Sequence, residues 1–368
     1  MRRNALLNLI FAAITAVCAM GVWMAQAQSA ASTLRIGFLA SPDDEDYDGA
    51  LVFKHYVEQK SAGRIAVEIF PSGQFCGNGR ECIEGLQTGT LDIHMTTVGG
   101  LGLLFGPAQV LDLPYAFADD GIAQCVFDGP LIDQLRDAVL DAGLGMRLMA
   151  ASNTGGWRNF ATRTTPVRHP DDLEGLKIRT TPAPLQQELV RRLGARPTPV
   201  TWSELYTALA TGVVDGTKNG VQDLVGMRFH EHLKHIALDR HSYMGALWWV
   251  SEQRWQMLPE PVRRIVHDGF QQLELVTRAL PIRAEVDAYR AFEAAGGTVH
   301  ELSPEARAAF RARAAGMRTW FAERYDPIWL ARLDRAIAAC EAGRQADFDA
   351  VAGAPNRAPN RDPTPPRD

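Results

Sequence analysis

Apolar runs and helical stretches take turns along the first hundred residues of the chain. Three short apolar runs bounded by turn residues predict strands, at 34–39, 65–70 and 91–95. Between them, 48–59 places apolar residues on one face of a helix, and 81–87 is a second helix that ends near Gly89. This alternation of strands and helices favours a parallel sheet covered by helices.

A second series of elements occupies the middle and the end of the chain. It contains predicted strands at 146–151, 176–179, 198–200, 213–214 and 246–250, and predicted helices at 183–193 and 203–210. A long helical stretch follows from 260 to 292, which Pro281 must kink or split. Ser303 and Pro304 are typical of a helix start, and this helix is expected to continue past Trp320.

The two ends of the chain have patterns of their own. Two arginines near the start precede an apolar run that ends at Trp23, and small residues follow at Ala25 and Ala27. This pattern predicts a secretory signal peptide, 1–27, cleaved after Ala27; the alternative is an uncleaved membrane anchor. No later stretch is apolar enough to span a bilayer, so we expect an exported, soluble product. Residues 353–368 are rich in Pro, Asn, Arg and Asp, which predicts a disordered tail.

Composition narrows the class of protein further. The chain has 368 residues, 46% hydrophobic and 22% charged, with a formal net charge of −5. These values are typical of a globular protein, and the length suggests two domains. The mild excess of acidic residues argues against a protein that binds the phosphates of nucleic acids, because such a protein needs a basic surface. It says little about small ligands, because one buried arginine can bind an anion inside an acidic protein.

Export changes the meaning of the cysteines. An oxidising compartment permits a disulfide between Cys76, in a loop rich in Gly and Asn, and Cys82, in the first turn of the next helix. The alternative is two separate thiols, with Cys82 in the core. Their spacing does not match that of a zinc ribbon. For Cys125 and Cys340 the sequence offers no pairing argument.

Common enzyme signatures are missing. The chain has no nucleophile elbow, no phosphate-binding loop of the Walker type, no dinucleotide-binding glycine motif and no zinc-protease motif. The histidines at 230, 232 and 235 lack a carboxylate at a spacing that would complete a metal site, so we interpret them as solvated. We therefore predict no catalytic residues, no metal and no cofactor.

Several segments, taken in order over roughly 34–325, resemble one protein family. They are 70–92 (from Phe-Pro-Ser-Gly to Gly-Thr-Leu-Asp), 110–117 (Val-Leu-Asp-Leu-Pro-Tyr-Ala-Phe), 172–179 (Asp-Leu-Glu-Gly-Leu-Lys-Ile-Arg), 203–209 (Ser-Glu-Leu-Tyr-Thr-Ala-Leu) and 212–216 (Gly-Val-Val-Asp-Gly). The chain is similar to the solute-binding subunits of tripartite ATP-independent periplasmic (TRAP) transporters, the DctP-like family. Each segment alone is weakly specific, whereas the ordered set behind a signal peptide is specific.

The resemblance implies a fold and a function. It implies an α/β periplasmic binding protein with two interleaved lobes, a ligand cleft between them and long helices that bridge them. We expect one lobe at 34–155 plus 245–283 and the other at 156–244 plus 284–345. It also implies a monomeric receptor without enzyme activity, which captures a small carboxylate in the periplasm and delivers it to the transporter's membrane subunits. The alternatives are a binding protein that feeds a sensor kinase, or an exported enzyme on the same scaffold.

The resemblance also implies ligand-binding residues. Arg179 matches the family's hallmark arginine at the end of the 176–179 strand, where an α/β sheet opens into its crevice. Its planar guanidinium suits a carboxylate, although a surface arginine paired with a nearby acid is the alternative. Arg158 matches a second ligand-contacting arginine, and Asn219 a ligand-facing asparagine. Trp202 stands where the family commonly has Phe, and a strand end is expected to bring Thr97 to the ligand.

Two local departures qualify this picture. Just before Asn219 the family usually has an acid or Gln-Glu, whereas this chain has Thr217 and Lys218, which we expect to add a cation to the rim of the cleft. The acidic run 43–46 could pair with an amino or ammonium group on the ligand, but a solvated loop is the favoured interpretation because acids are mostly exposed.

Overall fold

The structure, a computed structural model, describes residues 32–353. The predicted signal peptide and most of the predicted tail therefore lie outside the described residues. Within them, no helix combines the length and the apolar character needed to cross a membrane.

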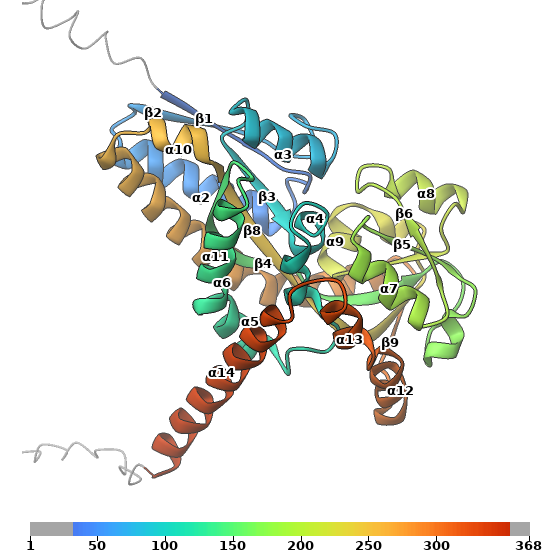
Figure 1. The fold of residues 1–368 in the computed structure, drawn as a ribbon. Coiled ribbons are helices and arrows are strands. Elements are labelled where there is room, and N and C mark those ends of the chain that lie inside the picture. The colour runs from blue at the N-terminus through green and yellow to red at the C-terminus, as the bar shows by residue number, and fades with distance from the viewer. Residues whose placement is uncertain (1–31, 354–368) are drawn as a thin grey trace, which may run out of the picture.

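Strands and helices alternate, as predicted, in both halves of the chain (Figure 1). The strands are β1 Ser32–Gly37, β2 Ile65–Phe70, β3 Ile93–Thr97, β4 Met146–Thr162, β5 Lys177–Thr180, β6 Arg196–Pro199, β7 Gly216–Asn219, β8 His235–Ser251 and β9 Thr298–His300. The α-helices are α2 Glu45–Lys60, α3 Gly79–Thr88, α4 Val98–Leu101, α5 Asp120–Phe127, α6 Pro130–Asp141, α7 Pro184–Arg192, α8 Leu205–Thr211, α9 Val221–Gly226, α10 Glu252–Met257, α11 Glu260–Ala294, α12 Pro304–Ala314, α13 Met317–Ala322 and α14 Ile328–Gly353. Three short 3-10 helices are η1 Gly106–Asp112, η2 Pro170–Leu173 and η3 Phe229–Glu231.

The nine strands form one sheet that runs through both lobes. Its order is β2-β1-β3-β8-β4-β7-β5-β6, with β9 paired to β8. Two parallel groups, β2-β1-β3 and β7-β5-β6, are joined by the antiparallel pair β4 and β8, which have 17 residues each. Because these two strands cross from one group to the other, the lobes are interleaved and not strung along the chain.

The length of β4 and β8 differs from the prediction, which placed short strands at 146–151 and 246–250. Both strands continue into polar and glycine-rich sequence that the apolar pattern does not mark. Apart from His235 and Arg240, the residues of these extensions are buried, and Thr154 and Arg158 among them line the cavity described below. The predicted strand at 213–214 is also wrong: these residues lie between α8 and β7, after Gly212 ends α8 in the left-handed conformation.

A distortion marks the middle of the β4–β8 pair. The pairing register of β4 with β8 changes between Asn153 and Trp157. There β4 passes through Gly155 and Gly156, whose φ angles are 69° and 77°. Positive φ of this size strains residues with a side chain. Gly155 is also packed tightly, because a Cβ built on Gly220 would lie 1.6 Å from the Gly155 carbonyl oxygen. We interpret this segment as the hinge between the lobes.

Long helices connect and extend the lobes. Helix α11 packs on α2 near one end and on α9 towards the other, with β4 between. It runs as one helix through Pro281, so of the two expected effects of this proline, a kink or a split, the split does not occur. The side chain of Gln222 donates a hydrogen bond to the carbonyl of Pro281. The helix that starts at Pro304 ends at Ala314, and a turn separates it from α13.

The last helix departs from the expected lobe assignment. α14 packs on α5, α6 and η1, and a disulfide between Cys125 and Cys340 ties it to α5. In Figure 1 its distal half extends away from the body of the molecule. α5 and α6 lie in the expected first lobe, so α14 packs on elements of that lobe, although 284–345 was expected in the second. In contrast, α12 and α13 pack on α7, in the second lobe.

The core is divided by the sheet. The adjacent residues Trp248 and Trp249 are both fully buried, but Trp248 belongs to the cluster around β1, β2 and α2, whereas Trp249 belongs to the cluster on the other face. This is the opposite-face arrangement that neighbours in a strand must have.

Candidate ligand-binding site

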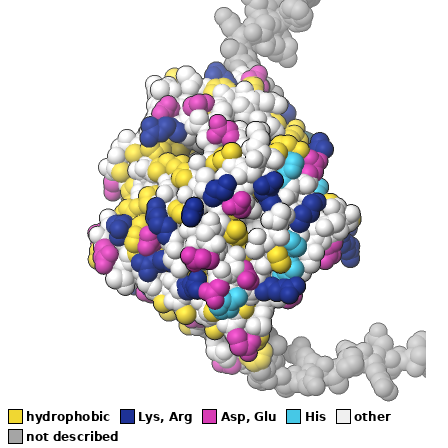
Figure 2. Space-filling model, turned by 90° about the vertical axis from the view of Figure 1, so that its right-hand side faces the viewer, with side chains coloured by type: hydrophobic (Ala, Val, Ile, Leu, Met, Phe, Trp, Pro, Cys, Tyr) yellow, Lys and Arg dark blue, Asp and Glu magenta, His cyan; other side chains and the backbone are white. Residues whose placement is uncertain are grey.

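A cavity of about 410 Å³ lies where the strand ends of both lobes meet. It is lined by all five sequence-predicted ligand residues: Arg179, Arg158, Asn219, Trp202 and Thr97. The other wall positions are mainly apolar, including Leu39, Ile83, Met95, Leu103, Leu104, Pro182 and Met244. On the face of the molecule in Figure 2, basic and acidic side chains are interspersed, with hydrophobic side chains gathered at upper left. Net surface charge therefore does not distinguish the cavity, and its own side chains must.

Arg179 sits at the carboxyl end of β5, as its place in the sequence predicts. It is 3% exposed, and its Nε donates a hydrogen bond to the Val200 carbonyl at 3.0 Å. No ion pair neutralises it among residues 32–353, so the alternative of a surface arginine paired with a nearby acid does not hold. Burial, and then the nearby charge of Arg158, lower the pKa of Arg179 to about 9. A buried, uncompensated guanidinium is well suited to receive an anion.

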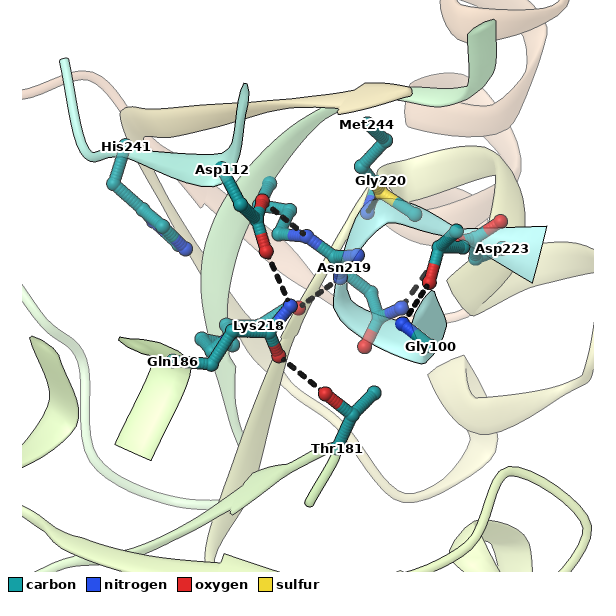
Figure 3. Close-up of polar contacts among 12 residues, drawn as sticks. Gly100, Asp112, Thr181, Gln186, Lys218, Asn219, Gly220, Asp223, His241 and Met244 are labelled. Carbon is teal, nitrogen blue, oxygen red and sulfur yellow. Dashed lines mark hydrogen bonds and ion pairs between the residues drawn. The ribbon is translucent and has the colours of Figure 1, made fainter. Parts of the chain in front are cut away.

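Arg158 belongs to a polar network that links the lobes, and Figure 3 shows its partners Asp112 and Lys218. Its Nε lies 3.7 Å from an oxygen of Asp112, at the end of η1, and its Nη1 donates to the Lys218 carbonyl at 3.3 Å. Gln186 of α7 donates to the other Asp112 oxygen at 2.6 Å and accepts from Thr181 at 2.9 Å. Burial alone would raise the pKa of Asp112, but Arg158 and Lys218 hold it below its ordinary value. Asp112 thus stays ionised and positions Arg158 beside the cavity.

Lys218 is not at a rim. It is 2% exposed in β7, and burial followed by the charge of Arg158 lowers its pKa well below the ordinary value. The sequence-based expectation of a rim cation is therefore wrong. A strand residue next to the cavity-lining Asn219 turns to the other face of the sheet, and Lys218 is not among the residues that line the cavity. Arg158 and Arg179 make this side of the cavity electropositive, although Asp112 compensates part of the charge.

Asn219, the last residue of β7, connects this cationic side to a carboxylate. Its Oδ1 accepts from Thr217 at 2.8 Å and its Nδ2 donates to Asp223 at 3.1 Å, as Figure 3 shows for the second contact. Asp223 is buried on α9 and also lines the cavity. Burial raises its pKa even though Asn219, Arg158 and Arg179 favour its ionised form. No sequence motif singled out Asp223.

The acidic run 43–46 corrects another expectation. Asp43 is exposed, but Asp44 is half-buried and lines the cavity, whereas Glu45 and Asp46 are buried at the start of α2. A solvated loop is therefore wrong for three of the four acids. Asp44 caps α2 by accepting a hydrogen bond from the Asp46 backbone at 3.0 Å, and Glu45 accepts one from the backbone of Gly155 at the hinge. Local helix capping draws the run inward.

Trp202 and Thr97 face the cavity from opposite lobes. The Arg179 guanidinium carbon lies 5.4 Å from the Trp202 ring centroid, so the indole also supports the arginine. Thr97 caps α4 through a hydrogen bond from the Gly100 backbone at 3.1 Å. Its neighbour Thr96 also lines the cavity, but the Thr96 hydroxyl already accepts a hydrogen bond from Trp249 at 2.8 Å.

The loop before α3 covers part of the cavity. The structure pairs Cys76 with Cys82, and Asn78, within the loop they close, lines the cavity. From the other lobe, Ser203 donates a hydrogen bond to the Gly77 carbonyl at 3.1 Å. The bridge therefore constrains a loop that contacts both the cavity and the opposite lobe.

The fold agrees with comparisons to known proteins. The model of the family described as bacterial extracellular solute-binding protein, family 7 (DctP), matches residues 36–323. The chain belongs to this family of TRAP-type solute-binding proteins.

Individual relatives show the same fold with different ligands. The C4-dicarboxylate-binding periplasmic protein DctP of Rhodobacter capsulatus is 28% identical over 310 residues, 83% of this chain and 91% of the relative. A TRAP periplasmic solute-binding protein of Anaerococcus prevotii with bound D-glucuronate superposes with a TM-score of 0.80 at 25% identity, covering 85% of this chain and 99% of that one. One from Polaromonas bound to D-erythronate has a TM-score of 0.78 at 27% identity, covering 83% and 98%.

Proposed function

We propose that this chain is an extracytoplasmic receptor that captures a small organic acid and delivers it to the membrane subunits of a TRAP-type transporter. The observation that carries the proposal is the pair of buried arginines, Arg158 and Arg179, on one side of a closed-in cavity. Neither is fully neutralised by the protein, so a ligand carboxylate supplies the missing charge.

The remaining site residues take complementary roles in this proposal. Arg179 holds the carboxylate through its terminal nitrogens, which make no hydrogen bond to described residues, while its Nε stays on Val200. Arg158 adds a second cation, and Asn219 a hydrogen bond. Trp202 packs against the body of the ligand and Thr97 contributes from the first lobe.

Capture is coupled to lobe closure. In this proposal the first lobe comprises 34–155, 245–283 and α14, and the second comprises 156–244 and 284–327. Only the closed form brings the wall that carries Thr97 and the wall that carries Arg179 to the same ligand, so the ligand favours closure. The hinge at Gly155 permits the movement. The closed lobes then dock on the membrane subunits, after export to the periplasm and removal of 1–27.

A thermal-shift screen tests ligand capture. The mature chain is heated with a panel of monocarboxylates, dicarboxylates, sugar acids and their amides. At a ligand concentration of 100 Kd, binding to the folded state stabilises it by about 2.7 kcal/mol, so an acid is expected to raise the melting temperature while its amide does not. Stabilisation by amides or neutral sugars but by no acid would contradict the proposal. Uptake of the acid by proteoliposomes that contain the cognate membrane subunits, dependent on this chain, tests delivery.

A further inference from the structure

The cavity has a second polar side, which carries hydrogen-bond acceptors. Asp44 and His94 line it from the β1–α2 turn and from β3. In the sheet, β3 is separated from β5 and its Arg179 by β8, β4 and β7. Asp44 and His94 therefore belong to the opposite lobe from the arginines, whereas Asp223, a third acceptor, lies in the arginines' own lobe on α9. A ligand that touches both the arginines and the acceptors must have two chemically different ends.

The surroundings of Asp44 disfavour negative charge. Asp44, Glu45 and Asp46 lie close to Asp223 of the other lobe, and none of the four forms an ion pair with any residue of the described chain. Both carboxylate oxygens of Asp46 are buried without a hydrogen-bond partner within 32–353. Burial, and then the neighbouring carboxylates, raise the pKa of Asp44 to about 7 and that of Glu45 and Asp46 above their ordinary values. Another carboxylate brought here would be repelled.

His94 gives an independent indication of the same chemistry. It is 1% exposed, and its Nδ1 lies 2.6 Å from the Gly37 carbonyl oxygen. A carbonyl can only accept, so Nδ1 carries the proton and Nε2 is left as an acceptor. Burial lowers the pKa of His94 to about 4, so the ring is neutral at pH 7. A neutral imidazole with a free acceptor suits a hydrogen-bond donor on the ligand and offers nothing to a carboxylate.

The opposite wall holds two buried arginines that suit a carboxylate; the other lining arginine, Arg80, is exposed and lies 4.0 Å from Glu84. Arg158 is 2% exposed, and its Nε has no hydrogen-bond partner in the described part of the chain. Arg179 points to the same space. Between the two polar ends the wall is largely apolar, with Leu103, Pro182 and Met244 among the lining residues. The cavity thus offers cations at one end and acceptors at the other.

We propose that the cavity selects acids with a single carboxylate whose other end donates hydrogen bonds, through hydroxyl groups or an ammonium group, and that it rejects dicarboxylates. This inference rests on the proposed capture of an organic acid. The carboxylate binds Arg158 and Arg179, and the donor end reaches Asp44, Asp223 and His94 Nε2. In a dicarboxylate the second carboxylate would face Asp44 and Asp223 instead.

Matched acids test the selectivity by calorimetry at pH 7.5. The first comparison is D-gluconate with D-glucarate, in which a carboxylate replaces the terminal hydroxymethyl group. The second compares succinate with 4-hydroxybutanoate and with 4-aminobutanoate, in which a hydroxymethyl or an aminomethyl group replaces one carboxylate. In each comparison the acid with one carboxylate is expected to bind at least tenfold more tightly. The ratio between 4-aminobutanoate and 4-hydroxybutanoate distinguishes an ammonium from a hydroxyl as the preferred donor.

Variants locate the effect. Asp44→Asn keeps a side chain able to cap α2 and removes the charge. It is therefore expected to lower the ratio of gluconate affinity to glucarate affinity at least threefold. Asp223→Asn should lower this ratio too. Asp43→Asn, the exposed neighbour, is the matched control and should leave the preference unchanged.

The outcomes separate this inference from the proposed function. The selectivity is overturned if glucarate and succinate bind as tightly as, or more tightly than, the acids with one carboxylate. If Arg179→Met abolishes that binding, acid capture still stands. A preference that Asp44→Asn and Asp223→Asn do not alter also overturns it. Failure of all five acids to bind overturns the selectivity, and failure of the wider acid panel overturns acid capture as well.

Discussion

Replacing Arg179 with methionine should have opposite effects on ligand binding and on the stability of the free protein. The guanidinium is buried and without an ionic partner in the described chain, and burial next to Arg158 lowers its pKa to about 9. A base whose folded pKa is depressed destabilises the fold while it is charged, and this penalty is fully present at pH 7, below the folded pKa. Methionine has a similar length and no charge, so it removes the penalty.

The magnitudes follow from the contacts. One pKa unit corresponds to about 1.4 kcal/mol, so the charged Arg179 costs the free protein a few kcal/mol. Losing the hydrogen bond from Nε to Val200 costs about 1 kcal/mol in the other direction. We expect the free energy of unfolding to stay equal or to rise. Removing one partner of a buried charge pair costs about 2–5 kcal/mol of binding, so affinity should fall roughly thirtyfold to a few thousandfold.

Calorimetry with the acid found by the thermal-shift screen measures the affinity, and urea unfolding measures the stability. Arg254→Met is the matched control. Its Nε lies 2.5 Å from the buried Asp92, outside the cavity, so this variant should lose stability by up to about 3–5 kcal/mol and keep its affinity. The reasoning is refuted if Arg179→Met binds within tenfold of the natural chain, or if it is destabilised as strongly as Arg254→Met.

Three further predictions concern the hinge, the disulfides and the acidic run. In urea unfolding, Gly155→Ala should lower the free energy of unfolding by about 1–3 kcal/mol more than Gly156→Ala does. The new Cβ at 155 would lie 2.7 Å from Asp223 Oδ1, whereas a Cβ at 156 would have no atom within 4 Å. Equal losses in the two variants would contradict this prediction. Replacing Cys125 and Cys340 with serine should lower the free energy of unfolding by up to about 5 kcal/mol, against about 2 kcal/mol for Cys76 and Cys82. A disulfide restricts the unfolded chain more when it closes a longer loop, and the two pairs are 215 and 6 residues apart. A larger loss for the short loop would contradict this prediction. The pKa of Asp44 is raised by burial, then by Asp223, to about 7, so its stabilising effect is present at low pH and is lost as pH rises from about 4 to about 7. Asp44→Asn should therefore flatten the decline in melting temperature over this range, and an unchanged slope would contradict the assignment.

Local signals predict much of the fold and of the anion side of the cavity. The strand 65–70 has the predicted bounds, and Arg179 is the last residue but one of β5, within one residue of the predicted strand end. Ser303 caps its helix through a hydrogen bond from the Ala306 backbone, as the Ser-Pro pair predicts. Such features depend on a few neighbouring residues, which a sequence pattern contains.

Features set by distant contacts are different. The full length of β4 and β8 depends on a partner strand and on burial of polar residues, so an apolar pattern finds only part of each. Asp44 and Asp223 are 179 positions apart, and nothing in either segment predicts that they meet at one cavity. The same holds for Cys125 and Cys340, which only the packing of α14 on α5 brings together.

The central claim is that a ligand carboxylate replaces the missing counter-charge of the cavity arginines. A crystal structure of the mature chain with the tightest-binding acid of the thermal-shift screen tests it most directly. We predict the carboxylate oxygens within about 3 Å of the terminal nitrogens of Arg179, with Arg158 alongside and the far end of the ligand towards Asp44. An acid bound outside this cavity, or inside it with no contact between its carboxylate and either arginine, would contradict the claim.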